Sequence, residues 1–564
     1  MAESAKKQNF LHGAALLAIA TAVVKVIGAL YKIPLKMIIE DQGYGYFCTA
    51  YDIYSVLLMI ATAGLPVAMS RMVSQKSALG QYNQVRRVYK TARALFVGLG
   101  LISGLLMFVF CRELAAFQGQ PDAWASVACL APCAVLMGMM STYRGFFQGQ
   151  GDMRPTSNSQ MLEAAVKLVI GLAAAYGLMV MTGSVALAAS GAILGVTVSC
   201  VVSVLYLTRK FQGVYRDMPQ TQEEVSSYAR TVKDLLAIAV PITIGSAGLQ
   251  LLTVLETSLY MGQLRGVLGS TMTTGELAAL LQSYDYAGET PLELLTREDM
   301  VQFALDTQKG IYNMTQTVFN MPCAFIAPIT VSVLPAITSH LTLKNNRGVR
   351  ETEESAARIT GLISLPCAVG LGLLASPVMS LLGGYSGVKL ELAGPLLAIL
   401  GVCVCLYAVV QYTNTLMQAH GYAYVPVINM LLAGVMKLAV VYILVGNPDI
   451  GILGAPLGAA LCYLCIAVLN LVAIRKCVPQ KPALLRNLLR PALPALIMGA
   501  AVFASYRGMI WLLGADTSRL ILCGGPIVVG VVVYCVLAVW FKSITREDCQ
   551  LLPKGDKIAK LLKL

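Results

Sequence analysis

Long runs of apolar residues, broken by short polar segments, extend along almost the whole chain. The first run, 11–31, contains twenty-one residues, which at 1.5 Å per residue span roughly the 30 Å hydrocarbon core of a bilayer. Runs of this length predict membrane-spanning helices. We expect fourteen spans, at 11–31, 46–69, 91–111, 124–147, 160–182, 184–208, 234–259, 311–338, 358–382, 391–413, 424–446, 451–474, 489–513 and 519–541.

The composition also indicates an all-α integral membrane protein. Hydrophobic residues make up 57% of the chain and charged residues only 13%, whereas charged residues are about 25% of a soluble globular domain. The fifteen cysteines lie mostly in apolar runs, so they are expected to pack as small hydrophobic residues and not to form a disulfide framework. The three histidines are far apart, and neither a metal site nor a cofactor is expected.

The charged residues gather in the connections between the expected spans. The net charge of +13 therefore follows the positive-inside rule and does not indicate nucleic-acid binding. The connection 70–90 is rich in Lys and Arg, whereas the long connection 260–310 is acidic. This alternation predicts that both termini face the cytoplasm and that the first span is an uncleaved signal-anchor. The tail 554–564 repeats lysine every third residue, which fits either an amphipathic helix on membrane lipids or a solvated tail.

Two sequence motifs recur six expected spans apart. LPVAMSR at 65–71 closes one span and LPAITSH at 334–340 closes another. Further on, QGQG at 148–151 has a counterpart in QAHG at 418–421, in the same order. Two matches in register predict a duplication of the first six spans. Both copies start in the cytoplasm, so we expect parallel repeats with a substrate site between the two halves.

The repeat predicts three parts. An N-terminal six-helix lobe covers 1–232, and a C-terminal six-helix lobe covers 233–480 and carries the acidic connection 260–310 on the outer side. The last two helices and a basic cytoplasmic tail cover 481–564. The acidic connection has no assigned role.

Five short motifs resemble one branch of a transporter superfamily. They are VKVIGALYKIPL at 24–35, GYGY at 43–46, AYDIY at 50–54, AGLPVA at 63–68 and YRGFFQG at 143–149. Together with the fourteen expected helices, they are similar to the stage V sporulation B and lipid II flippase branch of the multidrug/oligosaccharidyl-lipid/polysaccharide exporter superfamily.

The resemblance implies a flippase of polysaccharide or peptidoglycan biosynthesis in the bacterial cytoplasmic membrane. Its cargo would be an undecaprenyl-diphosphate-linked saccharide, moved by alternating access. Cell-wall synthesis proteins are possible partners, in addition to membrane lipids. The saccharide, a cell-wall, spore-cortex or exopolysaccharide precursor, is not specified by the sequence.

A lysine inside the first span is the first candidate for contact with such a cargo. Lys25 and Lys32 lie seven residues apart, so their side chains share one helical face, and Pro34 is expected to end the helix. A charge inside a span costs about 2.5–3.5 kcal/mol on insertion scales, so Lys25 is expected to face a protein cavity. Its long stem could instead reach the membrane interface.

A diphosphate needs fixed positive charge to cross a medium of low dielectric constant. We expect Lys25 to be its central contact and Lys32 an outer relay. Arg71 and Arg144, at the inner ends of their spans, are expected to receive the headgroup from the cytoplasm. Arg144 could equally be an anchor at the membrane boundary.

Acidic residues inside the spans are candidates for energy coupling. Glu256 is the carboxylate of the span 234–259, and we expect it to bind Na⁺ or H⁺ together with Asn429, or else to belong to a structural polar cluster. Glu163 and Lys167 are four residues apart and could simply neutralise each other.

Two other classes of function remain as alternatives. A cation-coupled multidrug exporter of the same fold would prefer an acidic or aromatic cavity, whereas lysines favour an anionic cargo. A polyprenyl-phosphate-dependent transferase would carry clustered acids or histidines on its loops, and no such pattern or Walker A motif stands out. We therefore expect a transporter and not an enzyme.

Overall fold

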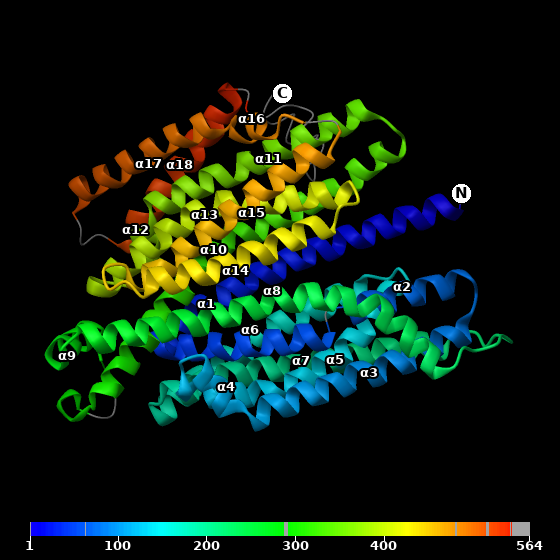
Figure 1. Ribbon diagram of the computed structural model, residues 1–564, viewed down its shortest axis with the longest axis horizontal. Helices are drawn as coiled ribbons and strands as arrows, with labels where there is room; N and C mark the ends of the chain where they lie inside the picture. The colour runs from blue at the N-terminus through cyan, green and yellow to red at the C-terminus, as the bar shows by residue number, and fades with distance from the viewer. Residues whose placement is uncertain are drawn as a thin grey trace. The chain divides into compact units, whose positions relative to one another are not determined.

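The computed structural model describes residues 2–62, 64–286, 291–479, 482–514, 518–541 and 543. Within these ranges, side chains are described except at 2–22, 25, 26, 29, 60–62, 241, 242, 244–247, 249, 327–332, 334–336, 339 and 342. All regular structure in the described ranges is helical (Figure 1). Ten helices there are long and apolar enough to cross a membrane. The chain is therefore a multi-pass helical membrane protein, and the count of fourteen spans stays a prediction.

The chain packs into two compact units. Unit 1 comprises Met1–Gly262 and Leu305–Gly310, and unit 2 comprises Gln263–Ala304 and Ile311–Leu564. The lobe boundaries expected at 232 and 480 stay predictions, as does the superposition of two repeats.

Unit 1 is organised around α1 (Ala2–Thr62), which contacts α3, α5, α6 and α7. The helix α3 packs on α5, and α6 packs on α7. The helices α5 and α7 pack on each other, and α2 packs on α5. The bounds are α2 Leu65–Ala78, α3 Tyr82–Val109, α4 Cys111–Phe117, η1 Pro121–Ala123, α5 Trp124–Gly149, α6 Arg154–Thr182 and α7 Val185–Arg216. The helices α8 (Tyr228–Thr271) and α10 (Arg297–Thr342) contribute residues to both units.

The helix α1 does not end at Pro34, contrary to the expectation from the sequence. Pro34 lies inside α1, and the helical backbone is interrupted six residues later at Glu40, where φ is 57° and ψ is −171°. Proline is tolerated inside membrane helices because neighbouring groups can satisfy the freed carbonyl. The segment after Glu40 is aromatic and buried, with Tyr44 and Phe47 stacked at 6.3 Å between ring centroids.

Unit 2 holds the remaining helices. Within it α11 packs on α13, α16 and α17, α14 packs on α15, and α18 packs on α17 and α12. The bounds are α9 Thr274–Ser283, η2 Leu292–Leu294, α11 Asn346–Leu373, α12 Ala375–Leu382, α13 Gly387–Ala419, α14 Tyr424–Val445, η3 Gly451–Leu453, α15 Gly454–Cys477, α16 Leu484–Leu489, α17 Ala492–Leu513 and α18 Arg519–Trp540.

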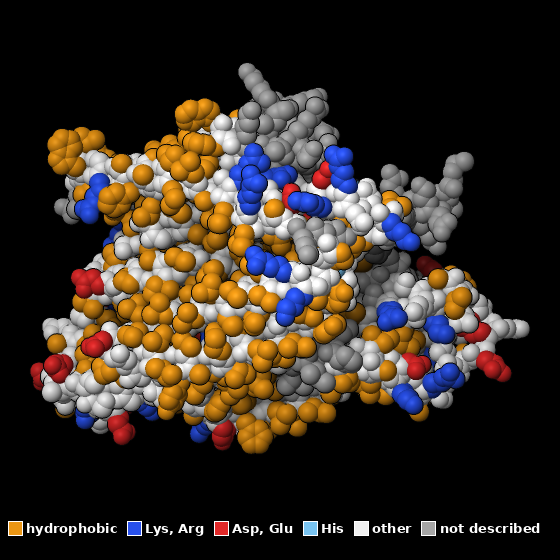
Figure 2. All heavy atoms as spheres, turned by 45° about the horizontal axis from the view of Figure 1, so that its top comes forward, with side chains coloured by type: hydrophobic (Ala, Val, Ile, Leu, Met, Phe, Trp, Pro, Cys, Tyr) orange, Lys and Arg blue, Asp and Glu red, His pale blue; other side chains and the backbone are white. Residues whose placement is uncertain are grey.

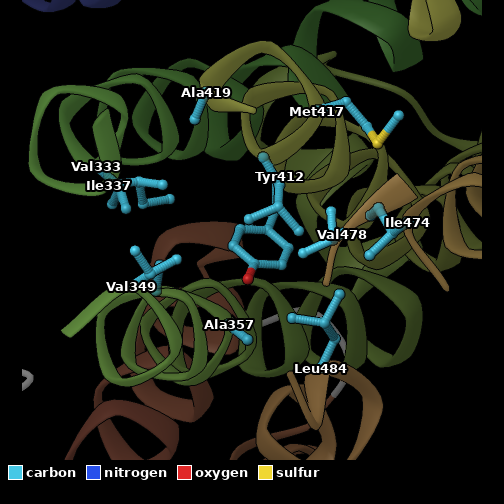
Figure 3. Packing of buried hydrophobic residues seen from close by; sticks show 12 residues of the cluster. Val333, Ile337, Val349, Ala357, Tyr412, Met417, Ala419, Ile474, Val478 and Leu484 are labelled. Atoms are coloured by element: carbon cyan, nitrogen blue, oxygen red, sulfur yellow. The ribbon is translucent and has the colours of Figure 1, made fainter. Parts of the chain in front are cut away.

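A hydrophobic cluster joins several of these helices at one end of unit 2. The ring of Tyr412 from α13 lies at its centre, with Val349 and Ala357 of α11 on one side and Ile474 of α15 nearby (Figure 3). The Tyr412 hydroxyl donates a hydrogen bond of 2.7 Å to the backbone oxygen of Glu353. A buried phenol normally needs such a partner.

The connection 260–310 is mostly helical rather than the long loop expected from the sequence. The helix α8 continues to Thr271, and α10 starts already at Arg297. Between them, Thr273 caps α9, accepting from the backbone N–H of Glu276, whose carboxylate in turn accepts from the backbone of Thr273. At the start of α10, Thr296 and Asp299 form the same pair of reciprocal hydrogen bonds. Such capping boxes satisfy the free N–H groups that open a helix.

The surface agrees with a membrane environment. Large hydrophobic side chains are exposed along the spans, for example Leu105 on α3, Val169 on α6 and Ile443 on α14. The face in Figure 2 carries a broad field of hydrophobic side chains, with charged side chains scattered within it and along its edges. A field of this extent would not be stable in water.

Candidate functional site

The most deeply buried charges described in unit 1 lie on α10. Lys309 is completely buried and Asp306 is 1% exposed, three residues apart on one helix. They face the second half of α1 and the short turn that follows α4. Leaving a charge of this kind uncompensated would cost several kcal/mol, so the partners around the two side chains decide what the cluster can do.

The partners form a continuous chain of hydrogen bonds. The Lys309 ammonium donates to the Thr49 hydroxyl, and this hydroxyl donates to Oε1 of Gln120. The Gln120 amide then donates to Oδ1 of Asp306 at 3.1 Å. The Tyr46 hydroxyl donates to the second carboxylate oxygen at 2.9 Å. All donors point from the ammonium toward the carboxylate, which lets the bonds polarise one another.

A small residue lets this chain form. Gly45 lies beside Tyr46 on α1, and a Cβ atom there would be 2.7 Å from the Gln120 amide nitrogen. Gly45 belongs to the GYGY motif at 43–46, so the motif positions the turn that carries Gln120. Lys309 also donates to the backbone oxygen of Gln118 at 3.5 Å.

The charges continue from this cluster along α1. Asp52 lies one turn after Thr49 and is close enough to interact electrostatically with Lys309, Lys32 and Glu256. Glu256, on α8, is 7% exposed. Unit 1 therefore contains cations and carboxylates near one another in the part of α1 that follows Lys32.

Two lysines of unit 1 lie close enough to repel each other. The Lys167 ammonium on α6 lies 5.6 Å from the centre of the Tyr31 ring on α1 and interacts electrostatically with Lys32. A cation over an aromatic face is stabilised by the ring electrons. Like charges in proximity inside a membrane protein are costly, and an anion between them would remove that cost.

The sequence suggests that Glu163 forms an ion pair with Lys167, but the structure gives Glu163 a different ion-pair partner. Glu163 accepts from Arg144 instead, at 3.0 Å, and Arg144 also donates to the Ser159 hydroxyl at 3.0 Å. Arg144 is thus held on α5 against α6. Glu163 still interacts electrostatically with Lys167, and it does so more strongly than Lys32 does.

The other predicted cargo contacts are placed as follows. Lys25 lies on α1, but its side chain is outside the described residues. Lys32 is partly exposed on the same helix. Arg71 is exposed on α2. The roles assigned to these residues and to Arg144 stay predictions.

The two residues predicted to couple an ion belong to different units. Glu256 is in unit 1, and Asn429 on α14 is in unit 2. Asn429 donates to the Asn470 side chain at 2.9 Å, and Asn470 donates in turn to Thr413 and Asn414 at 3.0 and 2.8 Å. This forms a polar cluster of α13, α14 and α15. A shared ion site stays a prediction.

Sequence reasoning missed two buried charged pairs. Lys309 lies in the expected acidic connection 260–310, so the sequence prediction does not include its burial with Asp306. In unit 2, His420 lies 2.6 Å from Oε1 of the fully buried Glu353. Both Lys309 and Asp306 fall on one face of a pattern of apolar residues from 300 to 314, which is the signal that could have revealed the helix.

Comparisons with known proteins agree with this architecture. Residues 10–340 match the family described as polysaccharide biosynthesis protein, and residues 300–516 match the family of the lipid II flippase MurJ. Stage V sporulation protein B of Bacillus subtilis is 22% identical, covering 97% of this chain and 98% of its own. The lipid II flippase MurJ of the same organism is also 22% identical, covering 90% and 89%.

Solved structures show the same fold. A lipid II flippase MurJ in an inward closed conformation superposes with a TM-score of 0.66 at 12% identity, covering 94% of this chain and 99% of that one. An inward-facing multidrug resistance transporter of the MATE family gives a TM-score of 0.60 at 16% identity, covering 81% and 97%. At such identities the likeness concerns the fold alone.

Proposed function

Because the chain belongs to the polysaccharide biosynthesis protein family, we propose that it moves an undecaprenyl-diphosphate-linked saccharide across the bacterial cytoplasmic membrane. The proposed cargo combines a diphosphate, a sugar and a long isoprenoid tail. Each of these needs a different environment on the way across.

The observation that supports this cargo most strongly is the pair of lysines in unit 1. Lys32 and Lys167 repel each other across α1 and α6, and Glu163, the one carboxylate that attracts Lys167, is shared with Arg144. A diphosphate carries a charge of about −2 and would convert that repulsion into attraction. Lysine acts as a point charge for phosphate and does not demand one fixed geometry, which suits a cargo that must move on.

A pocket in unit 2 suits the isoprenoid tail. A cavity of 480 Å³ lies between α10, α11, α12, α17 and α18. Its wall is almost entirely apolar, including Met321, Pro366 and Met498, and the Tyr534 hydroxyl at its edge donates to the backbone oxygen of Leu362 at 2.7 Å. Burying an isoprenoid there would gain about 25 cal/mol per Å² of apolar surface.

In this proposal the cargo passes between two lobes that alternate their access to the two sides of the membrane. Both termini face the cytoplasm, following the distribution of Lys and Arg. Lys25 and Lys32, together with Lys167, contact the diphosphate within the membrane, and Arg71 and Arg144 receive it at the inner side. Glu256 and Asn429 bind the coupling Na⁺ or H⁺.

A multidrug exporter of the same fold is the other candidate. The structural likeness to a MATE transporter favours its fold but not its cargo. A cationic drug would meet the positive charges of Lys32 and Lys167, which oppose its binding.

The proposal can be tested with purified protein in liposomes. The probe is a fluorescent undecaprenyl-diphosphate disaccharide, and the assay follows its accessibility to a quencher that cannot cross the bilayer. A charged hydrogen bond is worth about 1.5–3 kcal/mol, so Lys167→Ala should slow flipping by about 10- to 150-fold. Lys167→Arg should keep most of the rate because the charge remains.

The matched control is Lys90→Ala, which removes an exposed lysine of α3. It should flip the probe at the wild-type rate. Equal rates for Lys167→Ala and Lys90→Ala would contradict the assigned site. Transport of ethidium instead of the disaccharide lipid by the wild-type protein would favour the drug exporter.

A further inference from the structure

A second concentration of positive charge lies in unit 2, on residues that were not assigned to the cargo. A cavity of 720 Å³ opens beside α16, between this short helix and the start of α11. Arg350, Arg486 and Arg490 line it, and Glu354 is the one acidic residue among its lining side chains. The connection that carries α16 is among those rich in Lys and Arg, so the cavity is predicted to open toward the cytoplasm.

The single acidic residue in the wall is already engaged. Glu354 accepts from Arg350 Nε at 2.9 Å and from the backbone N–H of Ala483 at 3.1 Å. Arg486 and Arg490 are exposed and have no acidic partner in the portion of the chain that is described. The cavity therefore presents two unneutralised guanidinium groups.

A further arginine stands behind the cavity wall. Arg358 of α11 donates to the Asn487 side chain at 3.2 Å, and Asn487 lines the cavity. This bond fixes the side-chain amide of Asn487. The amide nitrogen donates to the backbone oxygen of Ala483 at 3.0 Å and so holds α16 in place. The positive wall is thus built on an ordered helix.

An apolar pocket adjoins the arginine cavity. It measures 580 Å³ and shares Ala483 and Arg486 with the first cavity. The rest of its lining is apolar, including Leu471 and Val472 of α15, except for Arg475. Leu485 and Leu489 of α16 are 45% and 51% exposed, beside the arginines. Exposed leucines next to arginines are typical of a helix at the level where lipid headgroups meet acyl chains.

We propose that these two adjoining pockets bind an anionic phospholipid. Its headgroup phosphate lies between Arg486 and Arg490, and one acyl chain occupies the apolar pocket. Guanidinium groups bind phosphate oxygens in a bidentate manner, and basic pockets beside membrane helices on the cytoplasmic side attract anionic headgroups. A free phosphate would leave the apolar pocket unfilled. The site goes beyond the proposed transport function because none of its residues was assigned to the cargo.

The test measures lipid binding directly, without transport. Purified full-length protein in neutral detergent is titrated with phosphatidylglycerol, and bound lipid is counted by native mass spectrometry. Each arginine near an anionic surface contributes about 1 kcal/mol. Arg486→Gln/Arg490→Gln should therefore weaken binding about thirtyfold, which corresponds to about 2 kcal/mol at 1.4 kcal/mol per tenfold. Phosphatidylcholine should not bind to the wild-type protein at the same concentrations.

The matched control is Arg209→Gln/Arg347→Gln, which removes two exposed arginines from basic segments of the chain that line neither pocket. It should bind phosphatidylglycerol like the wild type. The proposal fails if both double variants bind equally, or if phosphatidylcholine binds as well. It also fails if millimolar inorganic phosphate displaces the lipid, since the site would then take the free anion. Displacement by a stoichiometric amount of undecaprenyl-diphosphate disaccharide would overturn it in favour of a cargo site.

Discussion

Replacing Gly310 with alanine should disrupt the buried hydrogen-bond chain of unit 1. Gly310 follows Lys309 on α10, where α10 meets the interruption in α1. A Cβ atom at this position would lie 1.8 Å from the backbone oxygen of Asp41 and 2.5 Å from its carbonyl carbon. Backbone atoms cannot rotate away as the end of a side chain can, so the two segments would have to separate.

The size of the separation follows from the distances. Bringing the Cβ from 1.8 Å to the 3.0 Å that real contacts respect requires a displacement of about 1.2 Å. The Tyr46 hydroxyl lies 2.9 Å from the Asp306 carboxylate, and a displacement of this size along their bond would lengthen the distance to about 4.1 Å. At that distance the two groups no longer form a hydrogen bond.

The energy can be bounded in the same way. Overpacking costs about 1–3 kcal/mol, and two lost hydrogen bonds add about 1–3 kcal/mol. Alanine recovers up to about 1 kcal/mol through its higher helix propensity. The net loss of stability should therefore be about 1–6 kcal/mol.

The assay is thermal unfolding in detergent, followed by a thiol-reactive dye that labels buried cysteines such as Cys133 when they become exposed. The matched control is Gly262→Ala on α8, where an added Cβ meets nothing within 4 Å. The control should unfold at or slightly above the wild-type temperature, and Gly310→Ala clearly below it. Equal unfolding temperatures for the two variants would refute the steric argument.

Three further predictions concern single charges. Lys309→Met should lower stability by about 3–5 kcal/mol because Asp306 stays buried without its cation, and adding Asp306→Asn should restore part of it in the same unfolding assay. Glu256→Gln should make the flipping rate in liposomes independent of an imposed Na⁺ or H⁺ gradient, whereas a rate that still follows the gradient would remove this carboxylate from the mechanism. Hydrogen bonds from the backbone and hydroxyl of Thr273 lower the pKa of Glu276. The cap of α9 should therefore be intact above the ordinary glutamate pKa of about 4.3 and should be lost as the pH falls through the lower pKa that Glu276 has in the folded protein. Loss of the cap is measured as faster amide hydrogen exchange in α9.

The fold class was accessible from sequence because length and apolar periodicity dominate in a membrane. The breaks within helices were not, as Pro34 and Glu40 show. Proline disfavours a helix in water, yet in α1 the break falls at a glutamate whose positive φ no sequence rule assigns. The position of the break depends on packing. Next to it, Lys36 forms an ion pair with Asp41 at 3.3 Å, and α10 approaches the backbone of Asp41 closely.

The connection 260–310 shows the opposite case, in which local signals were sufficient but were outweighed. Thr273 with Glu276 and Thr296 with Asp299 have the spacing of capping boxes, which predicts two helix starts. The acidic composition instead suggested a loop. Lys309 then appeared to be a loop residue, and its tertiary partner Thr49, 260 positions away, could not be inferred without the fold.

The candidate cargo contacts were only partly accessible for a related reason. The sequence indicates Lys25 and Arg144 because they lie inside expected spans, and Lys32 because it shares a helical face with Lys25. It does not say which opposite charge each one meets. Glu163 could have paired with Lys167 on its own helix or with Arg144 on α5, and only the packing of α5 on α6 decides for Arg144.

The directed chain from Lys309 through Thr49 and Gln120 to Asp306 has a consequence for how this sequence can diverge. No member of the set can be replaced alone without leaving a buried donor or acceptor unsatisfied, so the four positions should drift as a group over evolutionary time. Relatives that keep a cation at the position of Lys309 should also keep a hydroxyl opposite it and a carboxylate one turn earlier. Relatives that lose the cation should have lost the carboxylate too, leaving a neutral and still hydrogen-bonded core.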